Sequence, residues 1–342
     1  MPDTLLADLT TLRVGGPAAR LVEAHDEASL VEAVPAADAA GEPVLLVAGG
    51  SNLLVADEGF DGTVVVVRSR GVRVESADAC SGATVTVAAG EPWDDLVARA
   101  VAEGWTGVEA LSGIPGSTGA TPIQNVGAYG QEVAQTLARV RVYDRVLRGV
   151  RTFAAADCAF GYRSSRFKAD PGRHVVLDVT FQLPLGDLGA PVAYAELART
   201  LGIEVGQRAP AAAVREAVLG LRRGKGMVLD AADHDTWSAG SFFTNPVLPD
   251  ASALPDDAPR WPADRGQVKA SAAWLIQHAG FERGHGLPGP ASLSTKHTLA
   301  LTNRGGASAA DLLALAREVR DGVRDRFGVE LVNEPVLVGV EL

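Results

Sequence analysis

Residues 112–130 read SGIPGSTGATPIQNVGAYG and form the most informative run of the chain. The wider segment 107–130 holds six glycines in 24 residues, where the chain average of 38 glycines in 342 residues gives about 2.7. Glycine adopts positive φ angles and lets another group approach the backbone amides closely, so such a segment can cradle a pyrophosphate. A set of tight turns between short strands is the alternative for this segment taken alone.

A second small-residue turn, Ala48-Gly49-Gly50-Ser51-Asn52, directly follows the apolar run 43–47. That run predicts a buried strand, and the N–H groups of the turn suit phosphate oxygens, as do the side chains of Ser51 and Asn52. The turn does not match Gly-x-Gly-x-x-Gly, so the ordinary dinucleotide-binding fingerprint is absent. By itself the turn is weak evidence for a cofactor site.

The hydrophobic patterns predict a mixed α+β chain. The clearest helix begins at Ser308, where Asp311 completes a start that resembles a capping box, and runs to Phe327. The sequence changes character near residues 184–200, where we place a domain boundary. The other expected helices are 27–40, 92–103, 211–223 and 272–279, and the expected strands are 43–47, 63–67, 84–88, 140–143, 175–183, 329–332 and 336–340.

The composition excludes several classes of protein. Lys plus Arg number 31 against 42 Asp plus Glu, a net charge of −11, so a nucleic-acid or anionic-membrane surface lacks its electrostatic footprint. The longest apolar runs, 43–48 and 63–67, fall far short of the ~20 residues of a membrane span, and Met1–Leu5 shows no export signal. We therefore expect a cytoplasmic protein that binds small molecules. Its two cysteines, Cys80 and Cys158, form no metal-ligand pattern and are expected to be reduced and buried.

Residues 160–168 read FGYRSSRFK and gather three cations and three aromatic side chains within an acidic protein. Arg163 offers a planar fork for a carboxylate, while Arg166 and Lys168 offer charge for phosphate. A solvated basic loop explains this segment equally well.

Ser241 lies in the run SAGSFFTNP (238–246), between a glycine and two bulky apolar residues. A serine in apolar surroundings can deliver a proton to a strongly basic carbon. The run does not match Gly-x-Ser-x-Gly and no Ser-His-Asp arrangement surrounds it, so a turn with a satisfied hydroxyl is the alternative. Glu334, between the expected strands 329–332 and 336–340, is either a site residue or a structural carboxylate.

Taken in order along the chain, these segments resemble the UDP-N-acetylenolpyruvoylglucosamine reductase family, the MurB flavoenzymes. The pair Ile-Pro-Gly-Ser-x-Gly and Gln-Asn-x-Gly-Ala-Tyr-Gly, followed by Gly-Ser-Phe-Phe, carries the resemblance most specifically. Further matches are Thr11–Gly16, Ala48–Leu53, Phe160–Arg163 and Glu334. The resemblance runs from about residue 10 to the C-terminus.

The resemblance implies an α+β protein with a two-subdomain FAD-binding domain of the PCMH/VAO-like type and a C-terminal α+β substrate-binding domain. We expect the FAD-binding domain in residues 1–185, split near residue 70, and a connecting loop and helix in 186–228. The substrate-binding domain is expected in 229–328, and a C-terminal strand region in 329–342 is expected to bring Glu334 to the active site.

The resemblance also implies that NADPH reduces a non-covalently bound FAD. The flavin then reduces UDP-N-acetylglucosamine enolpyruvate to UDP-N-acetylmuramate in peptidoglycan precursor synthesis. No histidine lies in residues 48–56, so a covalent histidyl-flavin has no obvious attachment point there. We expect a monomer that binds no nucleic acid, no membrane and no metal ion.

Carried over residue by residue, Ser241 resembles the proton donor, and Glu334 and Arg163 resemble the groups that stabilise the enolate. The implied substrate contacts are Tyr194, which matches the subtype with a tyrosine loop, Lys225, Asn245 and His297. The implied FAD contacts are Gly49, Gly50, Ser51, Asn52, Leu53, Gly113, Ile114, Pro115, Gly116, Ser117, Gly119, Ala120, Gln124, Asn125, Gly127, Ala128 and Tyr129.

Elementary chemistry supports these roles. Hydride addition to the β carbon leaves negative charge on the α carbon and the carboxylate, which a guanidinium such as Arg163 favours as it develops. Ser241 then protonates the α carbon, and Glu334 is expected to be a neutral acid that donates a hydrogen bond, because an ionised carboxylate would repel that charge. The sequence departs from the family at Thr244, where a lysine is common, and at His297, where some members have glutamine.

Two other functions stay open at this point. An FAD-dependent oxidase of the same fold would keep both glycine-rich segments but has no reason to keep Ser241, Arg163 and Glu334 together. A catalytically silent flavin or UDP-sugar sensor would bind FAD and fail to consume NADPH with the substrate.

Overall fold

The computed structural model describes residues 4–342, which fold into two compact units. Unit 1 comprises the chain up to Ala18, Gly50–Phe60 and Gly224–Leu342. Unit 2 comprises Ala19–Gly49 and Asp61–Arg223. The absence of an export signal was predicted from Met1–Leu5. The first three of these residues lie outside the described part of the chain. The domain limits expected at residues 185, 228 and 328 remain predictions. The two units are defined by contacts in space and do not test limits of functional domains.

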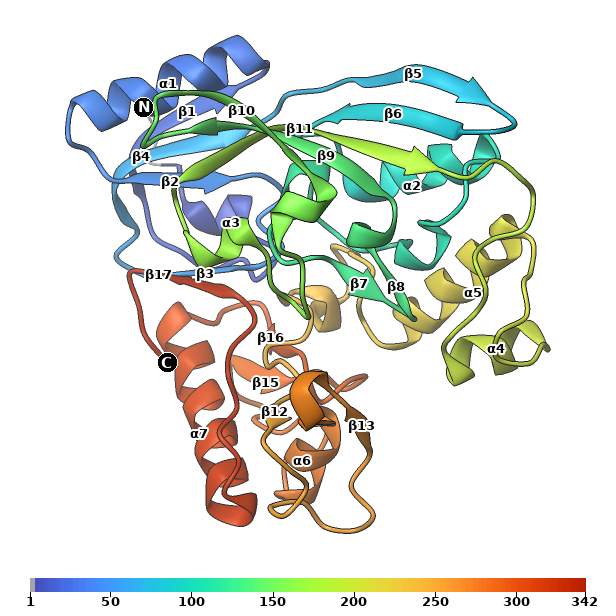
Figure 1. The fold of residues 1–342 in the computed structure, drawn as a ribbon. Helices are drawn as coiled ribbons and strands as arrows, with labels where there is room; N and C mark the ends of the chain where they lie inside the picture. The colour runs from blue at the N-terminus through green and yellow to red at the C-terminus, as the bar shows by residue number, and fades with distance from the viewer. Residues whose placement is uncertain (1–3) are drawn as a thin grey trace. The chain divides into compact units, whose positions relative to one another are not determined.

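Unit 2 contains a three-stranded sheet in the order β1-β4-β2 and a five-stranded antiparallel sheet in the order β10-β9-β11-β6-β5 (Figure 1). A two-stranded hairpin, β7-β8, follows the glycine-rich segment. The strands are β1 (Ala18–Ala24), β2 (Val44–Val47), β4 (Phe60–Val67), β5 (Val72–Asp78), β6 (Gly82–Ala88), β7 (Gly127–Ala128), β8 (Gln131–Glu132), β9 (Leu137–Asp144), β10 (Gly149–Ala154) and β11 (His174–Leu183). The helices are α1 (Glu27–Ala39), α2 (Trp93–Ala102), α3 (Arg166–Ala169), α4 (Ala195–Leu201) and α5 (Ala211–Gly224).

Side chains alternate across the five-stranded sheet, as the period of two in a strand requires. On β9, Val140 and Val142 are fully buried, whereas Arg139 and Arg141 form ion pairs with carboxylates on the opposite face. The apolar face therefore forms the main core of unit 2, and the opposite face is charged.

Helix α2 packs against this core through residues at helical spacing. Trp93, Leu96, Val97 and Ala100 are buried, and the Trp93 ring lies 5.8 Å from that of Phe181 on β11. Burial of a side chain of the size of Phe181 contributes about 1.5–3 kcal/mol. The same helix places its first turn beside the glycine-rich segment, because the Trp93 N–H donates to the Gly116 carbonyl at 3.0 Å.

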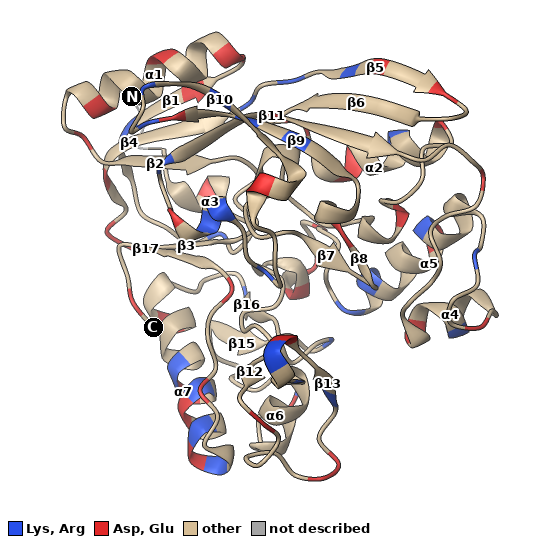
Figure 2. Ribbon diagram, in the orientation of Figure 1, with Lys and Arg blue, Asp and Glu red and all other residues tan. Residues whose placement is uncertain are grey.

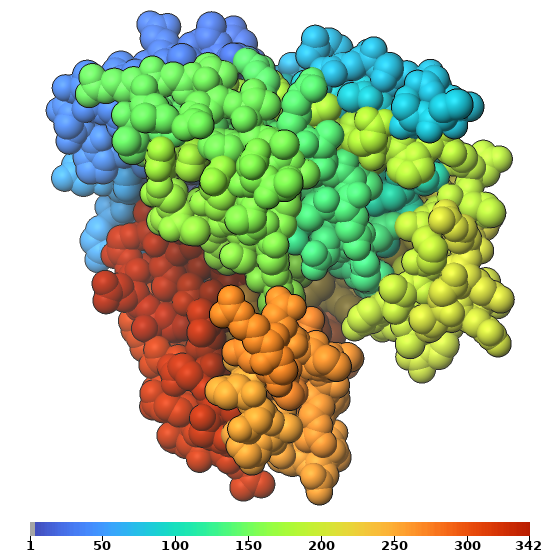
Figure 3. All heavy atoms as spheres, viewed as in Figure 1, coloured from blue at the N-terminus to red at the C-terminus, as the bar shows by residue number. Residues whose placement is uncertain are grey.

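The segment that carries α4 and α5 has a small core of its own, which includes Val192, Leu197 and Val218. In the space-filling view its yellow-green atoms lie beside the teal atoms of the glycine-rich segment (Figure 3). Ala110, next to that segment's start, also belongs to this core. The segment is therefore joined to the rest of unit 2 close to the predicted cofactor loops.

Unit 1 joins chain pieces that are far apart in sequence. β3 near residue 50 pairs in parallel with β17 near the C-terminus, in register Leu53 with Val336. Its core includes Leu12 from the first piece, Leu54 from the second and Leu312 from the third. The strands are β3 (Leu53–Val55), β12 (Val247–Leu248), β13 (Arg260–Pro262), β14 (Val268–Ala270), β15 (Ala291–Leu293), β16 (Leu301–Asn303) and β17 (Val336–Val338), and the helices are α6 (Ala272–His278) and α7 (Ala309–Phe327).

Helix α7 confirms the predicted helix start. Ser308 accepts from the backbone N–H of Asp311, and the Asp311 carboxylate accepts from the backbone N–H of Ser308. Its buried face faces the unit 1 core, while charges of both signs alternate along its C-terminal half (Figure 2). No helix within residues 4–342 is both long and apolar enough to cross a bilayer.

Two expectations are wrong. Residues 329–332 alternate buried and exposed side chains but form no strand, because their backbone meets a partner only around the bridge between Phe243 and Asn333. Cys80 is exposed in the turn between β5 and β6, whereas Cys158 is buried as expected. Burial raises the pKa of the Cys158 thiol to about 11.

Candidate active site

The two glycine-rich segments touch within unit 2. A Cβ atom on Gly49 would lie 2.6 Å from the Cα of Gly116, and one on Gly119 would lie 2.5 Å from the Cβ of Ala89. Real Cβ atoms do not approach this closely, so bare backbone is a steric requirement at both positions. The structure thus brings together two glycines, Gly49 and Gly116, that lie more than sixty residues apart in the sequence.

Ser117, between these glycines, carries a polar atom without a partner. Its side chain is 4% exposed, and its hydroxyl oxygen has no hydrogen bond to any described residue. Leaving such a group unsatisfied costs about 1–3 kcal/mol. A buried, unsatisfied hydroxyl beside close-packed glycine backbone fits a bound group that offers polar oxygens, as the phosphates of FAD do.

Helix α2 also fixes the loop that contains Ser117. The Gly113 N–H donates to Asp94 Oδ1 at 2.6 Å, and Arg215 on α5 donates to the same carboxylate at 2.6 Å. Burial raises the pKa of Asp94, but the hydrogen bonds from Arg215 and Gly113 outweigh it and hold that pKa below its ordinary value. Asp94 was not predicted as a site residue, because a single exposed-looking acid in a helix carries no sequence signal.

The end of the 48–52 turn belongs to unit 1. Gly50 has a φ of 58°, and a Cβ atom there would lie 1.8 Å from the carbonyl oxygen of Leu9. The Thr11 N–H donates to the Gly50 carbonyl at 3.1 Å. Leu53 then begins β3, so the turn passes directly into a paired strand.

Asn52 ties this turn to Glu334. Its side-chain nitrogen donates to the backbone carbonyl of Glu334 at 3.3 Å, and its own carbonyl accepts from the Val336 N–H at 2.9 Å. Glu334 is half-buried. Two residues predicted from separate ends of the sequence therefore lie side by side.

The segment of Ser241 is held next to the segment of Glu334. The Glu334 N–H donates to the carbonyl of Phe242 at 2.8 Å, and Phe243 forms an antiparallel bridge with Asn333. Phe242 and Phe243 are each 1% exposed and anchor the segment in the unit 1 core. Ser241 itself is half-buried, so its hydroxyl stands at the edge of an apolar, rigid segment.

Arg163 lies in unit 2 in a strained conformation. Its φ is 50°, in the left-handed region that costs non-glycine residues of order 1 kcal/mol or more. Its Nη2 donates to the Gly127 carbonyl at 2.8 Å, and Asn125 donates to the carbonyl of Gly161 at 3.2 Å. The predicted arginine and the predicted cofactor segment 124–129 are thus brought together.

The two other cations of the 160–168 run have structural roles. Lys168 donates to the backbone carbonyl of Arg163 at 3.0 Å. The Arg166 guanidinium lies 4.5 Å from the centre of the Phe153 ring. These contacts stabilise the turn that presents Arg163.

Tyr194 lies beside Tyr129. The two rings meet edge to face with centroids 5.6 Å apart, and Tyr194 is 46% exposed. Burial raises the pKa of Tyr129 to about 12 and raises the pKa of Tyr194. Both phenols therefore keep their protons near neutral pH and can donate hydrogen bonds to an anionic ligand.

The remaining predicted substrate contacts lie in unit 1. The side-chain oxygen of Asn245 accepts from the Ala272 N–H at 3.0 Å, at the start of α6. Lys225 is half-buried and directly follows α5. His297 lies in the short loop between β15 and β16.

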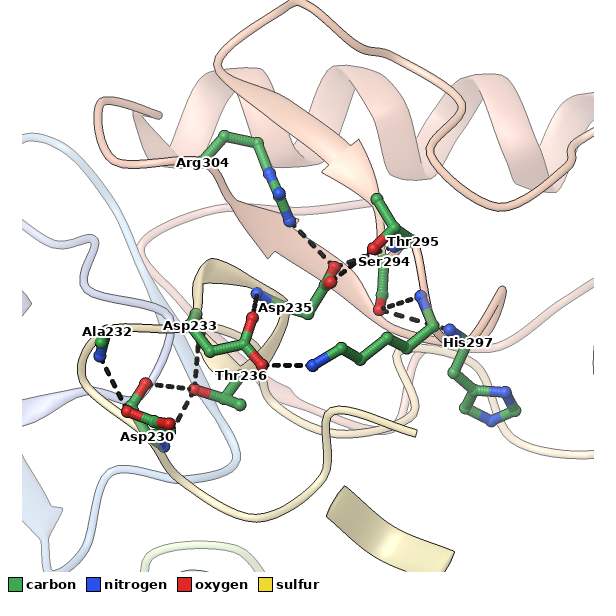
Figure 4. A network of polar contacts seen from close by, with 10 residues as sticks. Asp230, Ala232, Asp233, Asp235, Thr236, Ser294, Thr295, His297 and Arg304 are labelled. Carbon is green, nitrogen blue, oxygen red and sulfur yellow. Dashed lines mark hydrogen bonds and ion pairs between the residues drawn. The ribbon is translucent and has the colours of Figure 1, made fainter. Parts of the chain in front are cut away.

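A buried carboxylate, Asp235, holds that loop (Figure 4). It accepts from the N–H and the hydroxyl of Thr295 at 2.8 and 2.5 Å, and from Arg304 at 2.9 Å. Burial raises the pKa of Asp235, but these hydrogen bonds outweigh it and hold the pKa below its ordinary value. Sequence reasoning missed Asp235, since nothing in its neighbours marks it as buried.

Next to it, Lys296 donates to Asp233 at 2.5 Å, so its charge serves the loop itself. In Figure 4 the imidazole of His297 points away from this network. The two residues that precede His297 in the loop are thus fixed by carboxylates.

Two family models match successive parts of the chain. Residues 18–147 match the family model described as an FAD binding domain. Residues 231–338 match the UDP-N-acetylenolpyruvoylglucosamine reductase, C-terminal domain. A UDP-N-acetylenolpyruvoylglucosamine reductase of Streptomyces avermitilis is 58% identical, over 99% of this chain and 95% of its own length.

The chain belongs to the UDP-N-acetylenolpyruvoylglucosamine reductase family. Another member, from Cutibacterium acnes, is 59% identical over 98% of this chain and 90% of its own length. The crystal structure of the MurB enzyme of Thermus caldophilus matches with a TM-score of 0.66 and 26% identity, covering 98% of this chain and 97% of that one. Membership of the MurB family confirms the predicted fold class and FAD as the cofactor.

Proposed function

We propose that this chain reduces the enolpyruvyl ether of UDP-N-acetylglucosamine enolpyruvate to UDP-N-acetylmuramate with NADPH. One observation carries the proposal: the Glu334 N–H donates to the Phe242 carbonyl at 2.8 Å and so holds a hydroxyl and a carboxyl on adjoining segments. Reduction of a carbon–carbon double bond needs a proton donor and a group that stabilises transient negative charge, and this pair offers both.

The reaction adds a hydride to the terminal carbon of the double bond and a proton to the adjacent carbon. FAD, when bound, supplies the hydride that it receives from NADPH. The proton comes from Ser241, whose half-buried position limits competition from water. The vinyl group thereby becomes the methyl-bearing lactyl carbon, and no other bond of the substrate breaks.

Negative charge develops on the substrate before the proton arrives. Arg163 stabilises it, because a guanidinium already oriented by its bond to Gly127 needs no reorganisation as the charge forms. Glu334 acts as a neutral acid and donates a hydrogen bond to the same charge. These roles rest on the chemistry of the side chains and on the family resemblance.

The diphosphate and sugar of the substrate require donors and cations. We assign this binding to Tyr194, whose phenol keeps its proton, to Lys225, to the amide of Asn245, and to His297 on the loop that Asp235 fixes. The FAD contacts are assigned to residues 49–53, 113–117, 119, 120, 124, 125 and 127–129, with Ser117 as a donor to a polar oxygen.

We also propose that the enzyme acts as a monomer in the cytoplasm. A single chain carries every group that the proposed reaction needs, and both UDP-sugars and NADPH are cytoplasmic metabolites. A single scattering peak of 35.4 kDa would support the monomer, and twice that mass would contradict it.

An anaerobic absorbance experiment tests the reaction. The purified holoenzyme should show the visible flavin band, lose it on addition of NADPH, and regain it on addition of UDP-N-acetylglucosamine enolpyruvate. UDP-N-acetylglucosamine, which lacks the double bond, is the control and should not restore the band. A band that returns equally with both sugars, or only with oxygen, would overturn the proposal.

A further inference from the structure

Glu109 is a buried carboxylate for which the proposed chemistry has no use. It begins a short turn, Glu109–Leu111, at the start of the glycine-rich segment, and its side chain is 0% exposed. An ionisable group is rarely buried to this extent unless its hydrogen bonds are satisfied. Its partners therefore indicate why it is there.

The carboxylate joins three stretches of unit 2. One oxygen accepts from the side-chain nitrogen of Gln131 and from the Ala190 N–H, each at 2.7 Å. The other accepts from the Gly107 N–H at 2.6 Å. All three donors are neutral amide groups. An ionised carboxylate, which only accepts hydrogen bonds, can satisfy all of them.

The surroundings leave no room for a looser arrangement. A Cβ atom on Gly189 would lie 2.6 Å from the carboxylate oxygen that binds Ala190. One on Gly130 would lie 2.8 Å from the Cβ of Ala193. The stretch 189–193 is thus in close contact with both Glu109 and the end of the 124–130 segment.

Two of the three stretches bound by Glu109 lead to a tyrosine. Gln131 lies two residues after Tyr129, and Ala190 lies four residues before Tyr194. These two rings meet edge to face at 5.6 Å. The side-chain oxygen of Gln131 also accepts from the Ala110 N–H at 2.7 Å, which closes the arrangement around Glu109.

We propose that Glu109 is a positioning residue for substrate binding: it fixes the segments of Tyr129 and Tyr194 relative to one another and so sets the place of the Tyr194 phenol. The inference rests on the proposed substrate role of Tyr194. Glu109 does not touch the substrate and acts only through the tyrosine-bearing segments.

The substitution Glu109→Gln tests this role with little change of size. Glutamine has one oxygen and one NH2 group, so at least one of the three N–H donors loses its acceptor. Titration of the oxidised holoenzyme with UDP-N-acetylglucosamine enolpyruvate, without NADPH, should show a dissociation constant raised roughly 5- to 100-fold. KM should rise in parallel while kcat stays within about twofold, because the reacting groups are untouched.

Glu204→Gln is the matched control. Glu204 lies in the same 186–223 segment but is exposed, so the same change there should leave the dissociation constant unaltered. If Glu109→Gln lowers FAD content and melting temperature while affinity stays at the wild-type value, Glu109 is merely structural and the inference fails. If Glu109→Gln does not fold, Gly189→Ala, which crowds the same carboxylate, should reproduce the loss of affinity; an unchanged affinity there would also overturn it.

A double-mutant cycle with Tyr194→Ala separates this inference from the proposed function. If Glu109 acts through Tyr194, Glu109→Gln should add little in the Tyr194→Ala background. Fully additive losses would overturn the positioning role. No loss of affinity from Tyr194→Ala alone would instead overturn the substrate role proposed for Tyr194, a different result from additivity.

Discussion

Unit 1 and unit 2 present their candidate residues on different kinds of backbone. In unit 2, Arg163, Asn125 and Tyr129 all have positive φ angles, of 50°, 47° and 49°. In unit 1, neither Ser241 nor Glu334 has a positive φ angle, and their segments are joined by an ordinary backbone hydrogen bond. These residues of unit 2 therefore carry backbone strain, whereas Ser241 and Glu334 of unit 1 are held by backbone contacts without it.

This difference predicts that substitutions in the two units should have different effects on stability and activity. In unit 1 the candidate side chains can change while the backbone keeps its shape, so their removal should affect chemistry alone. In unit 2 a side chain and the strained backbone that carries it are coupled, so a substitution there should change stability and activity together. The following predictions test this distinction.

Ser241→Ala should have the largest effect. Loss of the proton donor should slow substrate-dependent reoxidation of the reduced enzyme by roughly 10²- to 10⁴-fold, while reduction by NADPH keeps its rate. Stopped-flow absorbance measures both half-reactions. The melting temperature should not change, since the segment is anchored by Phe242 and Phe243. Equal losses in both half-reactions would make Ser241 structural and contradict the description of unit 1.

Arg163 should show the coupling expected of unit 2. Arg163→Ala should lower kcat by roughly 10²- to 10³-fold, as the loss of one oriented charge stabiliser does elsewhere. Arg163→Gly should lose the same activity but unfold at higher denaturant than Arg163→Ala, because glycine adopts a φ of 50° without strain. Equal urea midpoints for the two variants would show that this φ stores no strain.

Gly49 and Gly50 are neighbours in the chain that belong to different units. Gly49→Ala would press on Gly116, and Gly50→Ala would press on the Leu9 carbonyl, so each should cost about 1–3 kcal/mol of unfolding free energy. Both residues are proposed FAD contacts, but only Gly49→Ala should also displace the loop of Ser117. Gly49→Ala should therefore raise the FAD dissociation constant, measured by flavin fluorescence, more than Gly50→Ala does.

Gly220→Ala serves as the control for both. Gly220 lies within α5 with nothing within 4 Å of an added Cβ, so alanine there should be neutral or stabilising by up to about 1 kcal/mol. If Gly50→Ala weakens FAD binding as much as Gly49→Ala does, the two positions do not report on separate units.

The smallest effect concerns pH and unit 2. His174 is packed against Phe153 and Phe167, and burial lowers its pKa below 6.5, although the Asp144 carboxylate 3.8 Å away opposes this. The folded state therefore disfavours the charged ring, so stability is complete above the ordinary pKa and falls as pH drops below it. The urea midpoint should fall between pH 7.5 and 5.5 in the wild type and fall less in His174→Phe. Parallel profiles for the two proteins would contradict this.

Local sequence signals predicted much of this molecule. The helix start at Ser308 and the need for bare backbone in the glycine-rich segment 107–130 both follow from what single residues allow their own backbone to do. Such signals need only a few neighbouring residues, so they can be read without knowledge of the fold. The strand expected at 329–332 shows the limit: its alternation of burial is real, but no pattern can tell whether a partner lies alongside.

The unpredicted part of the site consists of carboxylates that are buried, as Glu109 and Asp235 are, or half-buried, as Asp94 is. Glu109, Asp94 and Asp235 look like ordinary surface acids in the sequence, and their importance comes from amide, hydroxyl and guanidinium donors far along the chain. The contact between Ser241 and Glu334 segments is similar, since it depends on pairing across about ninety residues. Side-chain chemistry suggested both residues, but only the fold could place them together.

The interleaving of the two units sets an order in which the protein can be completed during synthesis. Unit 2 has all of its residues once the ribosome has passed Arg223. Unit 1 must wait for β17, the partner of β3, at residues 336–338. Until then the early pieces of unit 1, including the Gly50–Asn52 turn, have no finished structure to join. A nascent chain stalled before residue 336 should therefore resist protease in residues 61–223 and be cleaved in residues 224–335.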